Sequence, residues 1–313
     1  PINNRIYAFP WQVGVSVMYY RQDILNQLGM DEFPAGWTWD EHEELAEKAK
    51  TDLGIYTNWM GPGAEDKDCN LFVQMVWQAG GTFVSQDWTE VLVDSQICVD
   101  VASRLQRWWS KGLIFEGIFY SAPLWGAMRD GLLWSTVDPS WWILGMRNTI
   151  TTPEDHVGDW RIAPLPVFTE GGARTANEGG GGLAAPAYTE NPDLVKAFGE
   201  FATTDLNATV PTIQNGTVVA AQSSFTDPAV LDITFDITGD QRVHEVFAEL
   251  VQEVPPTFYY SAGWAEIRHI VAQNLMSIMR GDIEVEPGLA MIAEQARTAN
   301  ERWVGLLEAE PTS

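Results

Sequence analysis

Stretches with the period of a β-strand alternate with stretches of helical period along most of the chain, and this alternation limits the fold more than any other feature. Alternating apolar residues predict strands at 5–9 and 13–19, with a break at Pro10 and Trp11. Continuous apolar runs predict further strands at 132–137 and 160–163. Because helical segments lie between these strands, the sequence predicts an α/β protein.

Capping residues and glycines mark where the helices begin and end. Thr38 and Glu41 have the capping-box spacing, which predicts a helix from there to about residue 53. Proline starts, glycine stops and helical periodicity predict six more helices: near 70–79, from 95, from 123 to 131, from 192 past 201, from 264 to 281, and from 287 to about 307. The apolar face of the helix that begins at Pro192 consists of Leu194, Ala197, Phe198, Phe201 and Ala202.

Length and charge set the class of protein and exclude some partners. A chain of 313 residues is long enough for about two domains. Its 43 acidic and 18 basic residues give a net charge of -25, which repels phosphate backbones and anionic lipid. We therefore expect no nucleic-acid partner. No apolar run approaches the ~20 residues of a membrane helix, and no signal peptide is visible before the first strand-like segment.

The residues that metal or nucleophilic catalysis needs do not occur in the usual spacings. The four histidines are scattered, and His42 lacks the second histidine of a zinc-protease helix, so no metal and no cofactor are expected. The motifs of a nucleophile elbow and of a phosphate loop are absent from the sequence. Fifteen tryptophans are many for this length, and their flat faces suit carbohydrate rings as well as cores.

The two cysteines, Cys69 and Cys98, permit one disulfide but not a cysteine-only zinc cluster. Export would place them in an oxidising compartment, where a disulfide persists. Free buried cysteine is also common. The sequence leaves both states open.

The order of motifs resembles that of the family-1 extracellular solute-binding proteins, which serve ABC sugar importers. The family's Tyr-Ala-x-Pro strand corresponds to Tyr7–Pro10, and its next two elements correspond to 17–25 and 29–41. Later landmarks follow in the same order: Gln78–Gly81, Met128–Trp142, Gly180–Pro186 and Tyr260–Trp264. Arg21 and Gly36-Trp37 depart from the usual residues. The resemblance covers nearly the whole chain.

This resemblance implies two α/β lobes, joined by hinge strands, with a ligand cleft between them. Residues 1–12 and 180–228 would belong to the N-terminal lobe, and 13–179 and 229–313 to the C-terminal lobe. In the family, roughly a hundred residues precede the first matching strand. We therefore expect an upstream segment that completes the N-terminal lobe, carries the export signal and supplies further ligand contacts.

The resemblance also implies a ligand site made of aromatic faces and polar edge groups. The ligand-binding residues expected from it are Trp11, Asn58, Trp59, Asp138, Trp141, Glu178, Gly180, Gly181, Tyr260 and Trp264, with Gln222 as a weaker candidate. Each of these tryptophans could instead be a packing residue. Trp77, Trp108, Trp109 and Trp303 lie on helical apolar faces or at helix ends, and we expect them in the core.

The implied function is non-catalytic binding of a carbohydrate, with delivery to the permease subunits of an ABC importer. An extracytoplasmic, monomeric protein, periplasmic or a lipoprotein, is expected. One alternative is a secreted carbohydrate-active enzyme, which needs two carboxylates roughly 5–10 Å apart. Another is a binding protein for a different solute, such as a polyol, a phosphorylated glycerol or a peptide. A phosphate would require Arg or Lys, and the candidate segments contain none, so a neutral ligand is expected.

Overall fold

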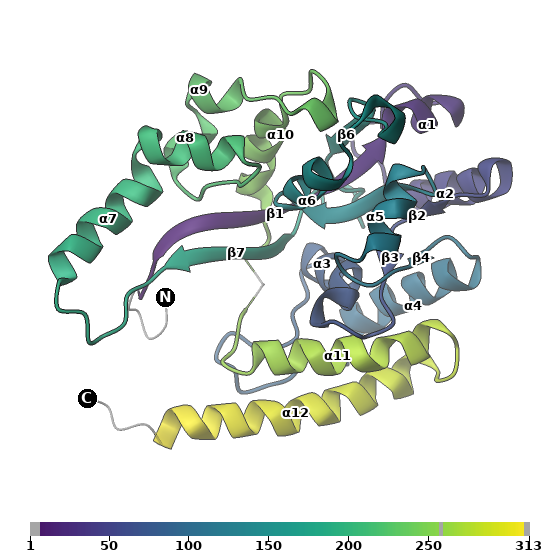
Figure 1. Ribbon diagram of the computed structural model, residues 1–313. Coiled ribbons are helices and arrows are strands. Elements are labelled where there is room, and N and C mark those ends of the chain that lie inside the picture. The colour runs from purple at the N-terminus through teal and green to yellow at the C-terminus, as the bar shows by residue number, and fades with distance from the viewer. Residues whose placement is uncertain (1–6, 257–258, 310–313) are drawn as a thin grey trace.

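The computed structural model describes residues 7–256 and 259–309 and has a mixed sheet at its centre (Figure 1). Four strands follow the order β2-β5-β1-β6, and a fifth, β7, also pairs with β1. A separate parallel pair is formed by β3 and β4. The strand bounds are β1 Phe9–Arg21, β2 Tyr56–Thr57, β3 Trp59–Met60, β4 Phe115–Glu116, β5 Leu133–Pro139, β6 Trp160–Ala163 and β7 Asn177–Leu183.

Strand β1 is one continuous strand, so the predicted break at Pro10 and Trp11 is wrong. Its first half pairs with β7, and its second half lies between β5 and β6. Register shifts between Pro10 and Gln12 and between Val13 and Val15 accommodate the proline. Proline is tolerated where a strand has an edge or a bulge. The predicted strand at 5–9 lies partly outside the described residues.

The predicted helix starts and stops are confirmed to within a few residues. The capping box at Thr38 is formed, and Gly54 ends the helix in the left-handed conformation. The helices are α1 Gln22–Gln27, α2 Trp39–Leu53, α3 Asn70–Gln78, α4 Gln96–Ser110, α5 Ala122–Arg129, α6 Trp142–Thr149, α7 Pro192–Thr204, α8 Leu206–Gln214, α9 Pro228–Leu231, α10 Val243–Leu250, α11 Trp264–Met279 and α12 Val285–Ala309. Short 3-10 turns are η1 Asp66–Cys69, η2 Pro153–Asp155, η3 Gln222–Phe225, η4 Asp236–Thr238 and η5 Val251–Glu253.

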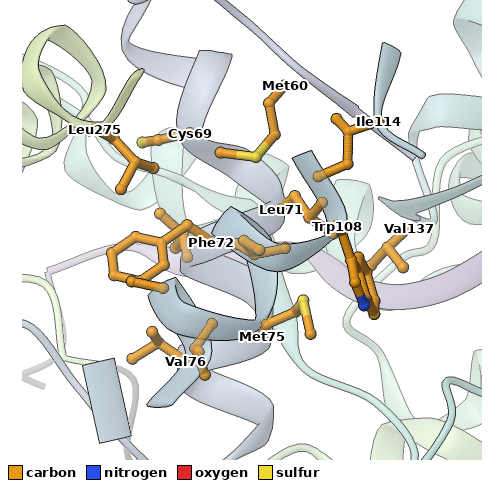
Figure 2. Packing of buried hydrophobic residues seen from close by; sticks show 14 of the residues in the cluster. Met60, Cys69, Leu71, Phe72, Met75, Val76, Trp108, Ile114, Val137 and Leu275 are labelled. Atoms are coloured by element: carbon orange, nitrogen blue, oxygen red, sulfur yellow. The ribbon is translucent and has the colours of Figure 1, made fainter. Parts of the chain in front are cut away.

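The largest core surrounds α3, whose nine residues are all buried. Figure 2 shows Phe72, Met75 and Val76 of this helix among side chains from distant parts of the chain, including Leu275 of α11. A second core contains Trp59, Trp125 and Trp142. Trp77 and Trp108 are buried as predicted. These cores hold the elements that carry the candidate site.

Helix α7 is formed where its sequence predicts a helix, and its apolar face is exposed. Leu194, Phe198 and Phe201 keep 68%, 61% and 48% of their surface accessible. Only Gly199 and Thr203 of this helix are buried, and Gly199 lies against the ring of Phe9. Figure 1 shows α7 at the far end of the β1–β7 pair, away from the main core. The apolar pattern predicts that a helix forms here, but it does not determine whether the apolar face is buried.

Both cysteines are free and buried, so the disulfide that the sequence permitted is not formed. The Cys69 thiol donates to the backbone oxygen of Asp66 at 3.3 Å, and the Cys98 thiol donates to that of Leu92 at 3.5 Å. Burial raises the pKa of each thiol to about 12. Both thiols are therefore protonated at neutral pH and act as core residues.

No helix within residues 7–256 and 259–309 combines the length with the apolar character that crossing a membrane requires.

Candidate functional site

A hollow of about 470 Å³ lies beside β7, at the start of α11. It is lined by Gln12, Val13, Lys67, Asn177, Glu178, Gly179, Gly180, Gly181, Tyr260, Trp264 and Arg268. These residues come from β1, η1, β7 and α11 and from the loop before α11. Five of the ten residues expected to bind ligand, Glu178, Gly180, Gly181, Tyr260 and Trp264, thus line one hollow.

The glycines of β7 leave bare backbone on the wall of the hollow. Gly179 has φ +84°, and a Cβ there would lie 2.9 Å from Nε1 of Trp141. On the adjacent strand, a Cβ at Gly14 would lie 1.9 Å from the carbonyl oxygen of Glu178. Glycine is therefore required at both places, because any side chain would separate β1, β7 and Trp141. Gly179, Gly180 and Gly181 thus line the hollow without side chains.

Trp264 and Tyr260 form an aromatic wall of the hollow. The Trp264 ring stacks on the buried ring of Trp77, with centroids 5.2 Å apart and planes 24° apart. Tyr260 stands nearly perpendicular to Trp264 at 5.2 Å, and its hydroxyl accepts a hydrogen bond from the Asn177 amide at 3.2 Å. Burial raises the pKa of Tyr260, so its hydroxyl stays protonated at neutral pH. Trp264 is thus both a core residue and a wall residue.

A buried ion pair lies at the hollow. The Arg268 guanidinium donates to Glu178 Oε1 at 2.8 Å, and Glu178 has no exposed surface. Arg268 also donates to Asn70 Oδ1 and, at 3.1 Å, to the backbone oxygen of Asp66. The second carboxylate oxygen of Glu178 has no hydrogen-bond partner among the described residues. A buried acceptor without a partner is costly, so this oxygen is an unsatisfied group behind the wall of the hollow.

Trp141 lies beside the hollow and contacts two residues that line it, Glu178 of β7 and Lys67. Its indole Nε1 donates to the backbone oxygen of Glu178 at 2.9 Å. Phe119 and Tyr120 pack near its ring at 6.2 and 6.4 Å between centroids. The Lys67 ammonium lies 4.8 Å from the centroid of the Trp141 ring and 5.2 Å from that of Phe119. The ammonium therefore lies over one face of the Trp141 ring.

Asn58, Trp59 and Asp138 lie in the interior, and the structure does not bring them to the hollow. Trp59 Nε1 donates to Asp138 Oδ2 at 3.1 Å, and Asn58 Oδ1 accepts from the backbone of Val137 at 2.8 Å. None of the three exposes more than 3% of its surface. Burial raises the pKa of Asp138 to about 8, and the charge of Glu178 adds to this shift. Asp138 is therefore mainly protonated at pH 7.

The remaining candidates also lie outside the hollow. Trp11 is half-buried on β1, and its backbone oxygen accepts from Ala220 at 2.9 Å. Gln222 is exposed in η3. Neither side chain lines the hollow.

Sequence reasoning missed Gln12, Lys67, Asn177 and Arg268, which all line the hollow. The candidate segments contain no Lys or Arg, and Lys67 and Arg268 reach the hollow from other positions in the chain. Arg268 lies four residues after Trp264 on α11, so helical spacing could have placed it on the same face. Lys67 lies in a polar loop with no periodicity, and the fold alone brings it to the hollow.

A cluster elsewhere has the residue types of a metal site. Ligand atoms of Asp23, His156 and Asp159 lie within 4.8 Å of one another. Asp23, however, accepts two bonds from Arg21, at 2.8 and 2.7 Å, and His156 is bonded to Asp159 at 3.0 Å. Their charges already have partners, so the cluster gives no ground for a metal role.

The sequence of this chain is similar to those of known bacterial binding proteins. The family described as bacterial extracellular solute-binding protein matches residues 1–208. An arabinooligosaccharide-binding protein of Halalkalibacterium halodurans is 30% identical over 196 residues, which are 61% of this chain and 42% of the relative. The chain thus spans less than half the length of this relative.

Two solved structures have a similar fold. A binding protein associated with an ABC transporter of B. animalis subsp. lactis, in complex with β-1,6-galactobiose, has a TM-score of 0.81 at 19% identity and covers 96% of this chain and 75% of its own. UgpB of Mycobacterium tuberculosis, in complex with glycerophosphocholine, has a TM-score of 0.73 at 19% identity, covering 97% and 73%. At such identities the likeness concerns the fold.

Proposed function

This chain belongs to the bacterial extracellular solute-binding proteins, and we propose that it binds a neutral carbohydrate, a mono- or oligosaccharide, in a cleft between two lobes. The sugar stacks on aromatic side chains and its hydroxyls bond to polar groups of the wall. The ligand is released to the permease subunits of an ABC importer.

The observation that carries this proposal is the pairing of an aromatic wall with a partnerless acceptor. Trp264 offers a flat apolar surface, and Glu178 offers a buried oxygen beside it. A sugar ring has the complementary surfaces, with C–H faces and hydroxyls at its edge. The Arg268 charge is already paired with Glu178, which favours a neutral ligand.

The proposed lobes are residues 1–12 with 180–228, and residues 13–179 with 229–313. The hollow supports this division because both sets contribute to its wall. Gln12, Gly180 and Gly181 belong to the first set, whereas Lys67 and Trp264 belong to the second. Ligand binding between lobes commonly closes them around the ligand.

Transport rather than catalysis is proposed, with an extracytoplasmic location as a periplasmic protein or lipoprotein, a monomeric state, and no cofactor or nucleic-acid partner. The enzyme alternative needs two carboxylates facing a ligand. In the structure, Asp138 is bonded to Trp59 and Thr136, and Glu178 is bonded to Arg268. Neither arrangement resembles an acid–base pair that flanks a substrate.

A non-sugar solute is the second candidate, favoured by one observation. Lys67 brings a cation to the hollow, and a protein of the same fold holds glycerophosphocholine. A phosphate ligand would use Lys67 as its main charge partner, because Arg268 is already paired.

A thermal-shift screen against carbohydrates, polyols and glycerophosphodiesters tests the proposal, because a ligand that binds only the folded state raises the melting temperature. For the best ligand, Trp264→Ala and Trp141→Ala should each weaken binding by about 1–3 kcal/mol, measured by calorimetry. Trp109→Ala, a half-buried tryptophan outside the hollow, is the matched control. Unchanged affinity in both site variants would contradict aromatic stacking at these residues.

A further inference from the structure

Lys67 is the cation of the hollow that lacks a carboxylate partner. Its ammonium lies over Trp141 and Phe119. Within the described part of the chain no acidic group comes within ion-pair distance of it, whereas Arg268 is paired with Glu178 at 2.8 Å and lies 3.7 Å from Asp66. Lys48, Lys111 and Lys196 each have an acidic partner.

The position of Lys67 is fixed by the loop that carries it. The buried carboxylate of Asp68 accepts hydrogen bonds from the backbone of Ala64 at 2.9 Å, Glu65 at 3.1 Å and Phe119 at 2.9 Å. These bonds tie η1 to the segment before α5. The turn that carries Lys67 is therefore anchored, and the Lys67 side chain lies over the Trp141 ring and lines the hollow.

A ligand that enters the hollow removes water from this ammonium. Hydroxyl groups replace only part of the lost hydration, and an ammonium that is buried without a partner is costly. A carboxylate compensates more fully, because a charge-assisted hydrogen bond is roughly twice as strong as a neutral one. A ligand with a carboxylate near Lys67 should therefore bind more tightly than a neutral ligand of the same shape.

We infer that Lys67 is a specificity-determining residue that extends the ligand range of the site to acidic sugars and favours a saccharide in which one unit is a uronate. The uronate carboxylate pairs with the Lys67 ammonium while the ring faces contact the aromatic wall. The inference rests on the proposed binding of a saccharide and changes one part of that proposal, the neutral charge of the preferred ligand.

The net charge of -25 acts against an acidic ligand at long range. That repulsion is screened beyond about 8 Å at physiological ionic strength, whereas a contact pair in a partly dry site is screened much less. The carboxylates of Glu178 and Asp66 both face Arg268. Both carboxylates are thus compensated by a cation other than Lys67.

The test uses the whole chain and matched pairs of ligands: galactose with galacturonate, glucose with glucuronate, and galactobiose with digalacturonate. Calorimetry gives the ratio of uronate to neutral affinity for the wild type, Lys67→Met, Lys67→Arg and Lys50→Met. Methionine keeps most of the apolar stem and removes the charge. Lys50 is the control, because it lies 3.6 Å over the ring of Tyr56 but outside the hollow.

We expect the ratio to exceed one in the wild type for at least one pair, to fall at least tenfold in Lys67→Met, to recover in Lys67→Arg, and to stay unchanged in Lys50→Met. Neutral binding with an unchanged ratio in Lys67→Met would overturn the inference and leave the proposed function standing. Absence of binding by every saccharide tested here and in the carbohydrate screen would overturn both. Melting curves without ligand show whether each variant is folded.

Discussion

Helices α3 and α7 have similar sequence signals but opposite surroundings. Both contain runs of large apolar residues with clear start or stop residues. All nine residues of α3 are buried, whereas Phe198 of α7 is 61% exposed and Leu194 is 68% exposed. Helix α3 is surrounded by side chains of α4, α11 and β5, while α7 contacts mainly β1 and α8.

This difference shows what local sequence determines. Caps, proline and glycine fix where a helix begins and ends, because they satisfy or remove backbone hydrogen bonds at its termini. Burial depends on which other elements reach the apolar face. The stability of α3 therefore depends on distant segments, and its residues should respond to mutation far more strongly than those of α7.

The largest expected effect compares a phenylalanine from each helix. Phe72→Ala leaves a cavity in the main core, where Phe72 has no exposed surface and lies 5.6 Å from the Phe83 ring. It should lower the free energy of unfolding by about 3–5 kcal/mol. Phe198→Ala should change it by less than about 0.5 kcal/mol. Urea denaturation of both variants measures this, and equal losses would refute the comparison.

The next effect concerns a buried carboxyl close to the α3 core. Burial raises the pKa of Asp138 from its ordinary value near 4 to about 8. The folded state then binds one proton more than the unfolded state between about pH 4 and 8. Stability should fall as pH rises through this window, by up to about 1.4 kcal/mol per pH unit.

Asp138→Asn should flatten this pH dependence in denaturation curves at pH 5, 6 and 7. Asp193→Asn in the first turn of α7, where Asp193 is exposed, is the control and should leave the slope as in the wild type. If the free energy of unfolding of Asp138→Asn changed with pH as steeply as that of the wild type, the raised pKa of Asp138 would not be the source of the pH dependence.

The smallest effect compares two helix starts. The Thr38 hydroxyl accepts from the backbone of Glu41 at 3.2 Å, so Thr38→Ala should cost about 1 kcal/mol. Asn191 precedes α7 without a side-chain capping bond, so Asn191→Ala should cost only a few tenths of a kcal/mol. Thermal unfolding of the two variants gives the difference. A larger loss for Asn191→Ala would mean that α7 depends on its start more than its geometry indicates.

The helices and most strands of this fold could be predicted, because their signals are local. Thr38, Pro123 and Gly281 mark helix ends that the structure confirms. The break at Pro10 was wrong because β1 accommodates this proline with register shifts. Such an adjustment depends on the partner strand and leaves no mark in the sequence of β1 itself.

The candidate site was predicted only in part. The glycines of β7 and Trp264 could be identified by resemblance and by their chemistry. Asn58 and Trp59 were expected at the ligand but hold β5 and Asp138 in the interior. Lys67 and Gln12 reach the hollow from elements far apart in the chain, and only the three-dimensional arrangement brings them together.

Strand β1 also sets where the chain can change in length. From Val15 to Arg21 every residue is buried, and both edges of this half are paired, with β5 and with β6. One inserted residue would turn each following side chain to the opposite face and break two registers at once. The half from Phe9 to Val13 is paired with β7 through existing bulges. Insertions and deletions should therefore accumulate in that half and be eliminated in the other.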